Sequence, residues 1–481
     1  MARPKTPSFI VELELSLNSH EKAIIKKKLN IARQIYNACL GEALKGLHRV
    51  QADKEYQELL KQPKSKERSA RLKEIELAHG YSEYQLQKWA KQCDCHFEGQ
   101  VGSALTQKLA SRAFDAVEKV HYHKAKKVNF KKKEELISVE GKSNEACIRW
   151  KDNIVIWGEL NLCVRIKKND AYVTEALKNR TKFVRIVPKV IRGKDRFYVQ
   201  LVQEGTPPIK KTKVVASPDA RVGIDPGTST MAIASKAGVE LAELAPGTQV
   251  DEKKLRRVQR AMDRSKRATN PGNFNENGTV KKGAKKWTDS NRYRKLATRR
   301  RELYRKISIE RKKSHEQLAN RILALGLDVR TEDMQYKALQ KRAKQTTRNK
   351  SNGKINKKKR FGKSLSNRAP AMFLSILDRK LHYYGAFLKK VDTKSLKASQ
   401  FNHVTGQYTK KELKDRWNVI NNQRVQRDLY SAFLIANTND TLDQVDVDLA
   451  NEWYNLFLTK HNQEVKNIKT NGSKMLKRFV A

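Results

Sequence analysis

The sequence has 481 residues, and its 102 Lys and Arg outnumber its 51 Asp and Glu, giving a formal net charge of +51 at pH 7. A chain of this length can form about two to four domains, and so large a positive excess makes a polyanion, nucleic acid before a membrane surface, the expected partner. No run approaches the roughly 18 apolar residues that span a bilayer, and the N-terminus lacks the apolar core of a signal peptide. The few, irregularly spaced cysteines suit a reducing cytoplasm; they are Cys39, Cys93, Cys95, Cys147 and Cys163.

The first predicted element is a strand. Alternate residues from Phe9 to Leu17 are apolar, and Glu12 and Glu14 lie between them, a pattern that predicts one amphipathic strand. Asn18 and Ser19 then offer an N-cap for a helix with apolar residues at helical spacing. The helical, polar pattern continues to about residue 126, with pieces at 48–61, 66–79, 82–93 and 101–122. A basic helical surface is usually only solvated, so this region does not identify a function by itself.

One cluster in the helical region contains metal-binding residue types. Cys93, Cys95 and His96 could bind a metal ion, but the Cys-x-Cys-His spacing fits poorly and no second pair follows. We therefore predict a structural role for these three residues.

The spacing of apolar residues changes to two after residue 140. Five short runs are rich in β-branched and aromatic residues and are separated by Asp, Asn, Gly and Lys; they read CIRW, NIVIW, LCVRI, FVRIVPKVI and RFYVQLV. This pattern predicts an antiparallel meander or a small barrel. The lone first strand could complete it, and the helical domain would then be an insertion after that strand. The stretch TPPIKKTK, from Thr206, resembles a linker into the next domain.

The next domain opens with three strand-like runs over residues 221–245. The first, RVGID, ends in Asp225 and is followed by a Pro-Gly turn. A carboxylate held at a strand end is a good metal ligand, although Asp-Pro-Gly is also a common turn, and the motif alone leaves both interpretations open. An antiparallel start with an acid on the first strand is what a ribonuclease-H-like fold shows.

The most basic part of the chain follows. Residues 251–368 contain 38 Lys and Arg against 11 Asp and Glu, and residues 341–368 contain twelve basic side chains and no acid. The second stretch could be a disordered, merely soluble loop. Because it lies between candidate acids, we favour a lid that contacts nucleic acid.

Two further acids lie at the ends of predicted elements. In LDVRTEDMQY, alternation predicts a strand that ends near Glu332. Residues 369–390 are predicted to be one helix, and QRDLYSAFLIAN, from Gln426, begins another with Asp428 in its first turn. An acid there often only compensates the helix dipole, and this reading stays open for Asp428 taken alone.

Taken together, the three acids suggest a metal site. Hydrolysis of a phosphodiester requires a nucleophilic water and stabilisation of charge on two oxygens, which two divalent ions supply when carboxylates hold them. Mg²⁺ prefers such oxygen ligands to Cys or His. No spacing rule proves that Asp225, Glu332 and Asp428 converge, so their convergence is a prediction.

These motifs resemble those of a known family, the TnpB transposon-associated nucleases and the related type V CRISPR effectors. GIDPG resembles the first motif of their RuvC-like nuclease domain, TEDM the second, and QRDLYSAFLIAN the third, while VQRAMDRSKR and RKLATRRRELYRKI resemble their basic bridging helices. The resemblance covers most of the chain. It implies an RNA-guided DNA endonuclease that cuts next to a short adjacent motif, with Asp225, Glu332 and Asp428 as catalytic ligands of two Mg²⁺ ions, for which Mn²⁺ can substitute.

The resemblance also implies a multidomain α+β fold. Residues 1–18 and 127–212 would form a wedge β-barrel, and residues 19–126 an inserted helical recognition lobe for the guide–target heteroduplex. Residues 213–394 and 426–481 would form the RuvC-like, RNase H-like nuclease domain, and residues 395–425 a degenerate zinc knuckle that binds target nucleic acid. The expected partners are a guide RNA, of the transposon-associated or CRISPR type, and double-stranded target DNA, in a bacterial or archaeal cytoplasm close to the nucleoid. The expected nucleic-acid contacts are Arg256, Arg257, Arg260, Lys357, Lys358, Lys359 and Arg360.

The knuckle departs from the family pattern. Many TnpB proteins have two Cys-x-x-Cys pairs between the second and third acids, but here those positions hold Asn402, Thr405, Asn418 and Asn421. Amides and hydroxyls cannot provide the thiolates that structural zinc prefers, and His403 is a single remaining donor. We therefore predict no structural zinc, a structural role for His403, and uncertain order for this segment.

We conclude from the sequence that a Mg²⁺-dependent, RNA-guided endodeoxyribonuclease is the leading hypothesis. The alternatives are a nuclease-inactive or weakly active RNA-guided DNA-binding regulator, against which three intact acids argue, and a non-guided basic nucleic-acid-binding protein, which would need no acids. A Holliday-junction resolvase shares the nuclease core but would not need the barrel or the helical lobe.

Overall fold

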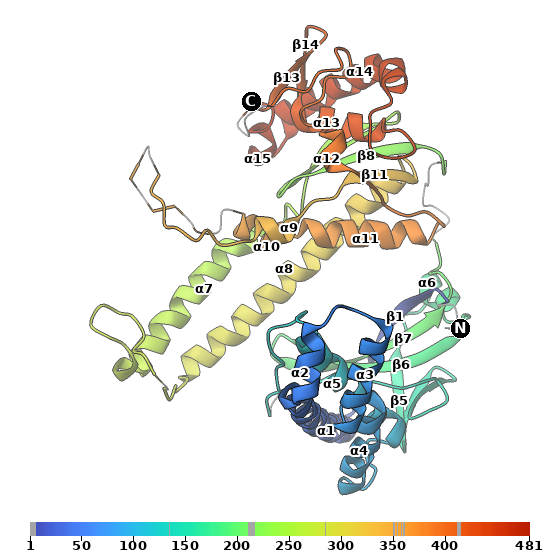
Figure 1. Cartoon of the computed structure of the whole chain (residues 1–481), viewed down its shortest axis with the longest axis vertical. Helices are drawn as coiled ribbons and strands as arrows, with labels where there is room; N and C mark the ends of the chain where they lie inside the picture. Colours follow the sequence, from blue (N-terminus) through green and yellow to red (C-terminus); the bar gives the residue numbers. More distant parts are fainter. Residues whose placement is uncertain are drawn as a thin grey trace. The chain divides into compact units, whose positions relative to one another are not determined.

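The chain forms two compact units, Met1–Lys210 and Lys211–Ala481, each with its own sheet and apolar core (Figure 1). The computed structural model describes residues 6–133, 135–209, 217–283, 285–349, 352–353, 355–356, 358, 361–410 and 415–481. Within these ranges, no helix is both long enough and apolar enough to cross a membrane.

Unit 1 is built on a seven-stranded sheet with the order β2-β6-β7-β1-β5-β4-β3. Its strands are β1 (Ser8–Leu15), β2 (Val139–Glu140), β3 (Ile148–Lys151), β4 (Ile154–Trp157), β5 (Leu160–Arg165), β6 (Thr181–Ile191) and β7 (Lys194–Glu204). The first strand lies in the middle, antiparallel to both β7 and β5. β3, at one end, also lies against β6 near the other end, so the sheet is nearly closed. The predicted meander is confirmed, and so is its completion by the first strand.

Five helices are inserted between β1 and β2. They are α1 (Ser19–Ala52), α2 (Lys54–Lys61), α3 (Lys66–Ala78), α4 (Glu83–His96) and α5 (Ser103–His121), and a short helix, α6 (Ala171–Ala176), follows β5. The predicted N-cap is confirmed: the Asn18 side chain accepts a hydrogen bond from the Glu21 backbone, and the Glu21 side chain accepts one from Asn18. This reciprocal capping box fixes the point where the strand gives way to the helix.

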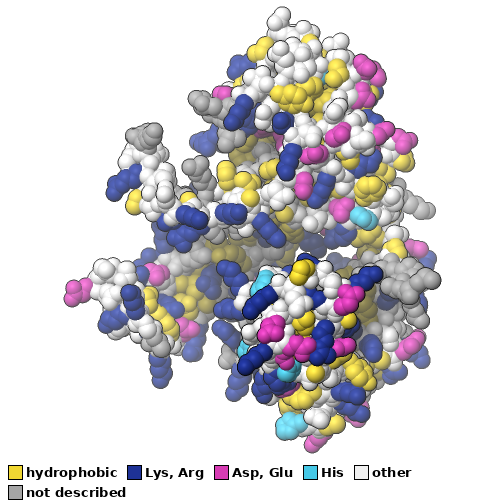
Figure 2. Space-filling view, in the orientation of Figure 1, with side chains coloured by type: hydrophobic (Ala, Val, Ile, Leu, Met, Phe, Trp, Pro, Cys, Tyr) yellow, Lys and Arg dark blue, Asp and Glu magenta, His cyan; other side chains and the backbone are white. Residues whose placement is uncertain are grey.

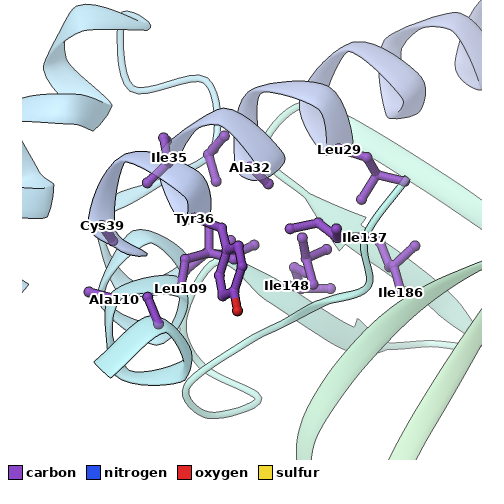
Figure 3. Packing of buried hydrophobic residues seen from close by; sticks show 14 of the residues in the cluster. Leu29, Ala32, Ile35, Tyr36, Cys39, Leu109, Ala110, Ile137, Ile148 and Ile186 are labelled. Carbon is purple, nitrogen blue, oxygen red and sulfur yellow. The ribbon is translucent and has the colours of Figure 1, made fainter. Parts of the chain in front are cut away.

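The core of unit 1 joins the helices to the sheet (Figure 3). One face of α1 packs on α5 and on residues of the sheet region; the side chains labelled in Figure 3 are Leu29, Ala32, Ile35, Tyr36, Cys39, Leu109, Ala110, Ile137, Ile148 and Ile186. Because one apolar cluster spans both parts, the helices cannot separate from the sheet without exposing it to water.

Unit 2 is built on a five-stranded mixed sheet with the order β10-β9-β8-β11-β12. Its strands are β8 (Arg221–Pro226), β9 (Thr230–Ser235), β10 (Val239–Glu243), β11 (Asp328–Glu332) and β12 (Lys389–Val391). The first three run antiparallel, as predicted for residues 221–245, while β11 is parallel to both β8 and β12. Strands far apart in the sequence therefore end side by side.

Helices cover both faces of this sheet. On one face, α8 (Asn291–Leu323) and α11 (Pro370–His382) contribute to an apolar cluster with alternate residues of β8, β9 and β11. On the other, α13 (Arg427–Ala436) and α14 (Val447–Asn471) contribute to a second cluster. The smaller elements are η1 (Pro271–Asn273), α9 (Tyr336–Leu339), α10 (Gly362–Arg368), α12 (Thr393–Leu396), a hairpin of β13 (Trp417–Ile420) and β14 (Gln423–Gln426), and α15 (Lys474–Lys477).

A long helical hairpin extends from the sheet of unit 2. α7 (Thr248–Thr269) lies along α8, and Figure 1 shows the pair reaching away from the five strands. Their contact is a narrow apolar seam of Leu255, Val258, Met262, Leu303 and Ile307. The remaining surface of the hairpin is rich in Lys and Arg, although Tyr304 and Ile309 of α8 are also exposed. Figure 2 shows basic, acidic and hydrophobic side chains on its visible part.

One predicted helix was too long. The apolar stripe over residues 369–390 predicted a single helix, but α11 ends at His382 and the chain then forms the edge strand β12. Gly385 has a φ of 74°, in the left-handed region that ends a helix. Leu388 nevertheless packs on the same cluster, which explains why its position matched the helical stripe.

Candidate functional site

Two of the three predicted acids lie at neighbouring strand ends. Asp225 is near the end of β8, and Glu332 is the last residue of β11. The two strands are parallel and pair Ile224 with Thr331, so the next residue on each strand is one of the acids. Since side chains alternate along a strand, burial of Val222 and Ile224 in the α8–α11 cluster turns Asp225 toward the α13 face.

The third acid reaches this place through a glycine. Asp428 lies in the first turn of α13, and a Cβ built on Gly223 would lie 1.9 Å from the Ala432 carbonyl oxygen and 2.4 Å from the Ala436 nitrogen. No other residue type allows the helix backbone to approach β8 so closely. The first glycine of the GIDPG motif therefore permits the packing that brings the start of α13 to the acidic strand ends.

A buried arginine holds the other end of α13. Arg330, only 1% exposed, donates hydrogen bonds from Nη1 to the Thr438 carbonyl and to Thr438 Oγ1, the latter at 3.0 Å. Its Nη2 lies 2.8 Å from Asp328 Oδ2. Because the helix is fixed to β11 just beyond its C-terminus, its N-terminus and Asp428 are fixed as well. Sequence reasoning missed this residue, since an arginine within a strand ordinarily points to solvent.

The electrostatics of Asp225 show that the three acids are close together. Burial raises the pKa of Asp225 well above its usual range, and the negative charges of Glu332 and Asp428 raise it further, while the positive charge of Arg427 partly opposes them. Burial also raises the pKa of Glu332. Among the described residues, neither carboxylate accepts a hydrogen bond or forms an ion pair. A site of this kind disfavours negative charge unless a cation enters it.

Asp428 differs from the other two because arginines neutralise it. Arg427 donates to Asp428 Oδ1 from Nε at 3.2 Å and from Nη2 at 3.1 Å. Arg416 Nη1 lies 3.7 Å from Oδ2. Neither arginine was predicted, although Arg427 stands beside the acid in the QRD motif.

The three acids supply the type of ligand atom, carboxylate oxygen, that a hard divalent cation prefers. All three donors are carboxylates, and two of them, Asp225 and Glu332, form no ion pair in the part of the chain that is described. As the side chains stand, however, no three His, Cys, Asp or Glu residues in the described ranges are grouped closely enough to hold a metal ion. Binding would therefore require the carboxylates to draw together and Arg427 to release an oxygen of Asp428.

A tyrosine next to the acids was also missed. Burial, together with the charge of Asp225, raises the pKa of Tyr336, and its hydroxyl is buried without a hydrogen-bond partner among the described residues. Glu332 and Tyr336 help to line a pocket of 340 Å³ that also contains Lys390. The only sequence signal was the position of Tyr336 four residues after Glu332.

The basic stretch 341–368 is held near Asp225 at both ends. Just before it, Tyr336 lies beside Asp225; in its last part, Ser364 of α10 donates to the Thr228 carbonyl at 2.9 Å and lies 2.7 Å from Ser229 Oγ. Arg368 at the end of α10 forms a buried ion pair of 2.7 Å with Glu243. The turn that follows Asp225 and the end of the basic stretch are therefore held together.

The predicted nucleic-acid contacts are placed only in part. Arg256, Arg257 and Arg260 are exposed on α7, on the side away from its apolar seam with α8. Lys358 is half-buried, and its carbonyl accepts a hydrogen bond from the Ala343 backbone at 2.8 Å. Three further predicted contacts, Lys357, Lys359 and Arg360, lie outside the described residues.

The knuckle segment is held by apolar packing in the described ranges. Leu396, Phe401, Ile420 and Val425 are buried in the α13–α14 cluster. His403 is 1% exposed, its Nδ1 lies 2.7 Å from the Tyr430 hydroxyl, and burial lowers its pKa to about 4, so the ring is neutral. The segment therefore has an internal source of order that was not expected from its sequence.

We accordingly expect purified protein to carry far less than one zinc per chain, because apolar packing holds the segment and thiolate ligands are lacking. Metal analysis of the protein measures this directly, and zinc-selective chelators should leave both folding and activity unchanged. Stoichiometric zinc bound within residues 399–421 would contradict the prediction.

Two solved structures are similar to the chain. The cryo-EM structure of a Cas12f1–sgRNA–target DNA complex matches at 12% sequence identity with a TM-score of 0.41, over 90% of this chain and 99% of that one. The cryo-EM structure of a CRISPR-Cas12f ternary complex matches at 14% identity with a TM-score of 0.26, over 89% and 83%. No protein-family model matches the chain, and no curated protein matches its sequence. At these scores the likenesses do not assign a function, which has to be argued from the site.

Proposed function

We propose that the chain is an RNA-guided DNA endonuclease that hydrolyses phosphodiester bonds at a RuvC-like site. The observation that carries the proposal is the convergence of Asp225, Glu332 and Asp428 at one end of the five-stranded sheet. Each comes from a motif that resembles one of the three RuvC motifs, and the antiparallel opening of the sheet is that expected of a ribonuclease-H-like domain. The net charge of the chain is +51, which suits the binding of a polyanion. Within so basic a chain, the group of three acids is a place that suits cations.

The mechanism follows from the charges of the site. Asp225 and Glu332 form no ion pair in the described ranges, although the positive charge of Arg427 acts on Asp225. They are therefore the carboxylates best able to hold Mg²⁺ or Mn²⁺, with Asp428 as the third ligand. Two such ions, if held there, would supply activation of the attacking water and neutralisation of charge on the attacking and leaving oxygens. The chain itself orients these ligands through Gly223 and Arg330, which fix α13 on the sheet.

The arginines next to Asp428 have a second use in this mechanism. In the metal-free site, Arg427 and Arg416 compensate the negative charge of Asp428. If a bound ion compensated that charge instead, their guanidinium groups could contact the substrate phosphate, which they match in geometry. Exposed arginines of α7 add contacts to the nucleic-acid backbone that do not depend on sequence.

A guided but nuclease-inactive DNA-binding regulator is the second candidate. Two observations favour it: the described carboxylates are not grouped for metal binding, and Asp428 is already paired with arginine. The two candidates predict the same nucleic-acid partners but differ in whether DNA is cut when Mg²⁺ is added.

The guide is tested by changing its sequence. RNA that copurifies with the protein would be sequenced, and its variable segment of about 20 nucleotides or fewer rewritten. Because base pairing rather than the protein would read the target, cleavage should move to the newly matching DNA wherever the adjacent motif is kept. The measurement is the position of the cut on plasmid DNA, with the original target as the control.

Two results would count against guidance. RNA-free protein that cuts equally well would indicate an unguided nuclease, and a cut site that stays in place after the guide is rewritten would exclude RNA-directed targeting. Binding that moves with the guide, without any cleavage in Mg²⁺ or Mn²⁺, would instead support the nuclease-inactive regulator.

A further inference from the structure

A large cavity lies in the helical part of unit 1. It has a volume of 820 Å³ and opens between α2, α3 and the C-terminal end of α5. Four aromatic side chains contribute to its wall, namely Tyr56, Tyr81, Phe114 and Tyr122. Cavities of a few hundred to about 1,000 Å³ that combine aromatic walls with a few polar groups are typical of sites for small planar ligands.

The inner polar groups of this cavity form a connected network. The Tyr56 hydroxyl donates to Glu76 Oε1 at 3.3 Å and lies 3.1 Å from His121 Nε2. His121 Nε2 is also 3.4 Å from Glu76 Oε1, and the two side chains are 9% and 19% exposed. Among the described residues, Glu76 Oε2 and the Glu118 carboxylate have no partner. The cavity therefore presents hydrogen-bond acceptors that the protein itself does not use.

Tyr81 supplies the complementary donor. Its side chain is 4% exposed, and its hydroxyl is buried without a hydrogen-bond partner in the described ranges. Burial, and then the charges of Glu76 and Glu118, raise the pKa of Tyr81, so the hydroxyl stays protonated. Buried tyrosine hydroxyls usually have a hydrogen-bond partner, and leaving such a hydrogen bond unmade costs free energy. The hydroxyl is thus poised to donate to a ligand.

The mouth of the cavity has basic side chains beside one acid. Lys73, His123 and the exposed Glu83 help to line it, and Lys124 Nζ lies 5.8 Å from the centre of the Tyr122 ring. Figure 2 shows acidic side chains among basic ones on the face of unit 1 that carries α2 and α3. A phosphate is favoured beside Lys73 and Lys124, while a free cation is disfavoured there. The arrangement suits a ligand with an anionic group outside and N–H donors inside.

We infer that this cavity binds a guanine base, presented by an unpaired nucleotide. Guanine offers two adjacent donors, N1–H and the N2 amine, to a carboxylate such as Glu76, and its O6 can accept from the Tyr81 hydroxyl. Adenine and cytosine would place a ring-nitrogen lone pair against that carboxylate, and uracil offers only one N–H. Unpaired bases are commonly stacked on aromatic side chains and read along their Watson–Crick edges in this way.

The first experiment measures base preference with the full chain. Guanosine, inosine and adenosine 5′-monophosphates would be titrated by calorimetry at a salt concentration high enough to suppress general phosphate binding. Guanosine monophosphate is expected to bind at least about tenfold more tightly than adenosine monophosphate, as a bidentate contact discriminates between bases. Inosine monophosphate, which lacks the N2 amine, should lie between them. Equal binding of guanosine and adenosine monophosphates would overturn the inference. So would a cavity that binds the cation tetramethylammonium but neither of these nucleotides.

Four variants locate the preference in the cavity. Glu76→Gln and Tyr81→Phe should each reduce the guanine preference to about threefold or less; Tyr81→Phe removes a hydroxyl that has no partner in the described ranges and should leave folding intact. The matched controls are Glu74→Gln, an exposed acid on the same helix that pairs with Arg71, and Tyr84→Phe, an exposed tyrosine outside the cavity. A preference that survives both cavity variants would overturn the inference.

Labelled ten-nucleotide RNA and DNA strands with one guanine or one adenine distinguish the sources of the base. If the preference for guanine over adenine is larger among the strands than among the free monophosphates, the ligand is a strand. If it is larger among the free monophosphates, the ligand is a nucleotide. All these measurements record binding alone. Their failure would leave the cleavage tests of the acidic site unaffected, and the loss of cleavage activity would leave this inference standing.

Discussion

Replacing Asp225, Glu332 or Asp428 by alanine is expected to reduce DNA cleavage by at least about 10³-fold. Charge stabilisation by bound metal contributes several kcal/mol to such a reaction, and each 1.36 kcal/mol corresponds to about a tenfold change in rate. Because the three carboxylates act as one ligand set, a double variant should be hardly slower than a single one. The measurement is the single-turnover cleavage rate with guide and target DNA bound.

The matched control is Asp333→Ala, which removes the acid next to Glu332. Asp333 is exposed and forms an ion pair of 2.8 Å with Lys390, so its loss should change cleavage by less than about threefold. Guide and target binding should be nearly unchanged in all the variants, and EDTA should stop cleavage by the unaltered protein. A variant of Asp225, Glu332 or Asp428 that cuts at a near-normal rate would remove that residue from the site.

Two kinds of strand in this chain could be predicted from the residue types. Alternation from Phe9 onward identified β1, which is buried on one face, and the short apolar run TMAIAS identified β9, which is buried on both faces. The edge strand β12 has only three residues, too few to show a period, and its neighbour Leu388 packs with α11. It was therefore absorbed into a predicted helix.

The acids of the site could be predicted because each stands at the end of a recognisable motif. The residues that position them could not. Arg330 contacts Thr438, more than one hundred residues away in the sequence, and Arg416 approaches Asp428 through the fold of a hairpin. Such contacts depend on how separate elements pack, and no local pattern records them. The proximity of Tyr336 to Asp225 is of the same kind.

Gly223→Ala is expected to destabilise unit 2 by about 3 kcal/mol, at the upper end of what overpacking usually costs. The added Cβ would lie 1.9 Å from a carbonyl oxygen and 2.4 Å from a nitrogen of the α13 backbone, and a helix backbone cannot rotate away as a side chain can. The helix would have to lift from β8, which would move Asp428 away from Asp225. Thermal unfolding followed by circular dichroism should show a lower transition temperature, and cleavage should fall even at temperatures where the variant is folded.

Gly41→Ala is the control for the glycine substitution itself. Gly41 lies within α1, and nothing comes within 4 Å of a Cβ built there. Alanine favours a helix interior over glycine by roughly 0.5–1 kcal/mol, so this variant should be as stable as the unaltered chain or slightly more stable. The opposite signs expected for the two substitutions separate close packing from a general effect of removing glycine. If Gly223→Ala unfolds at the same temperature as the unaltered protein and cleaves at the same rate, then α13 does not depend on that glycine for its contact with β8, and the placement of Asp428 must have another cause.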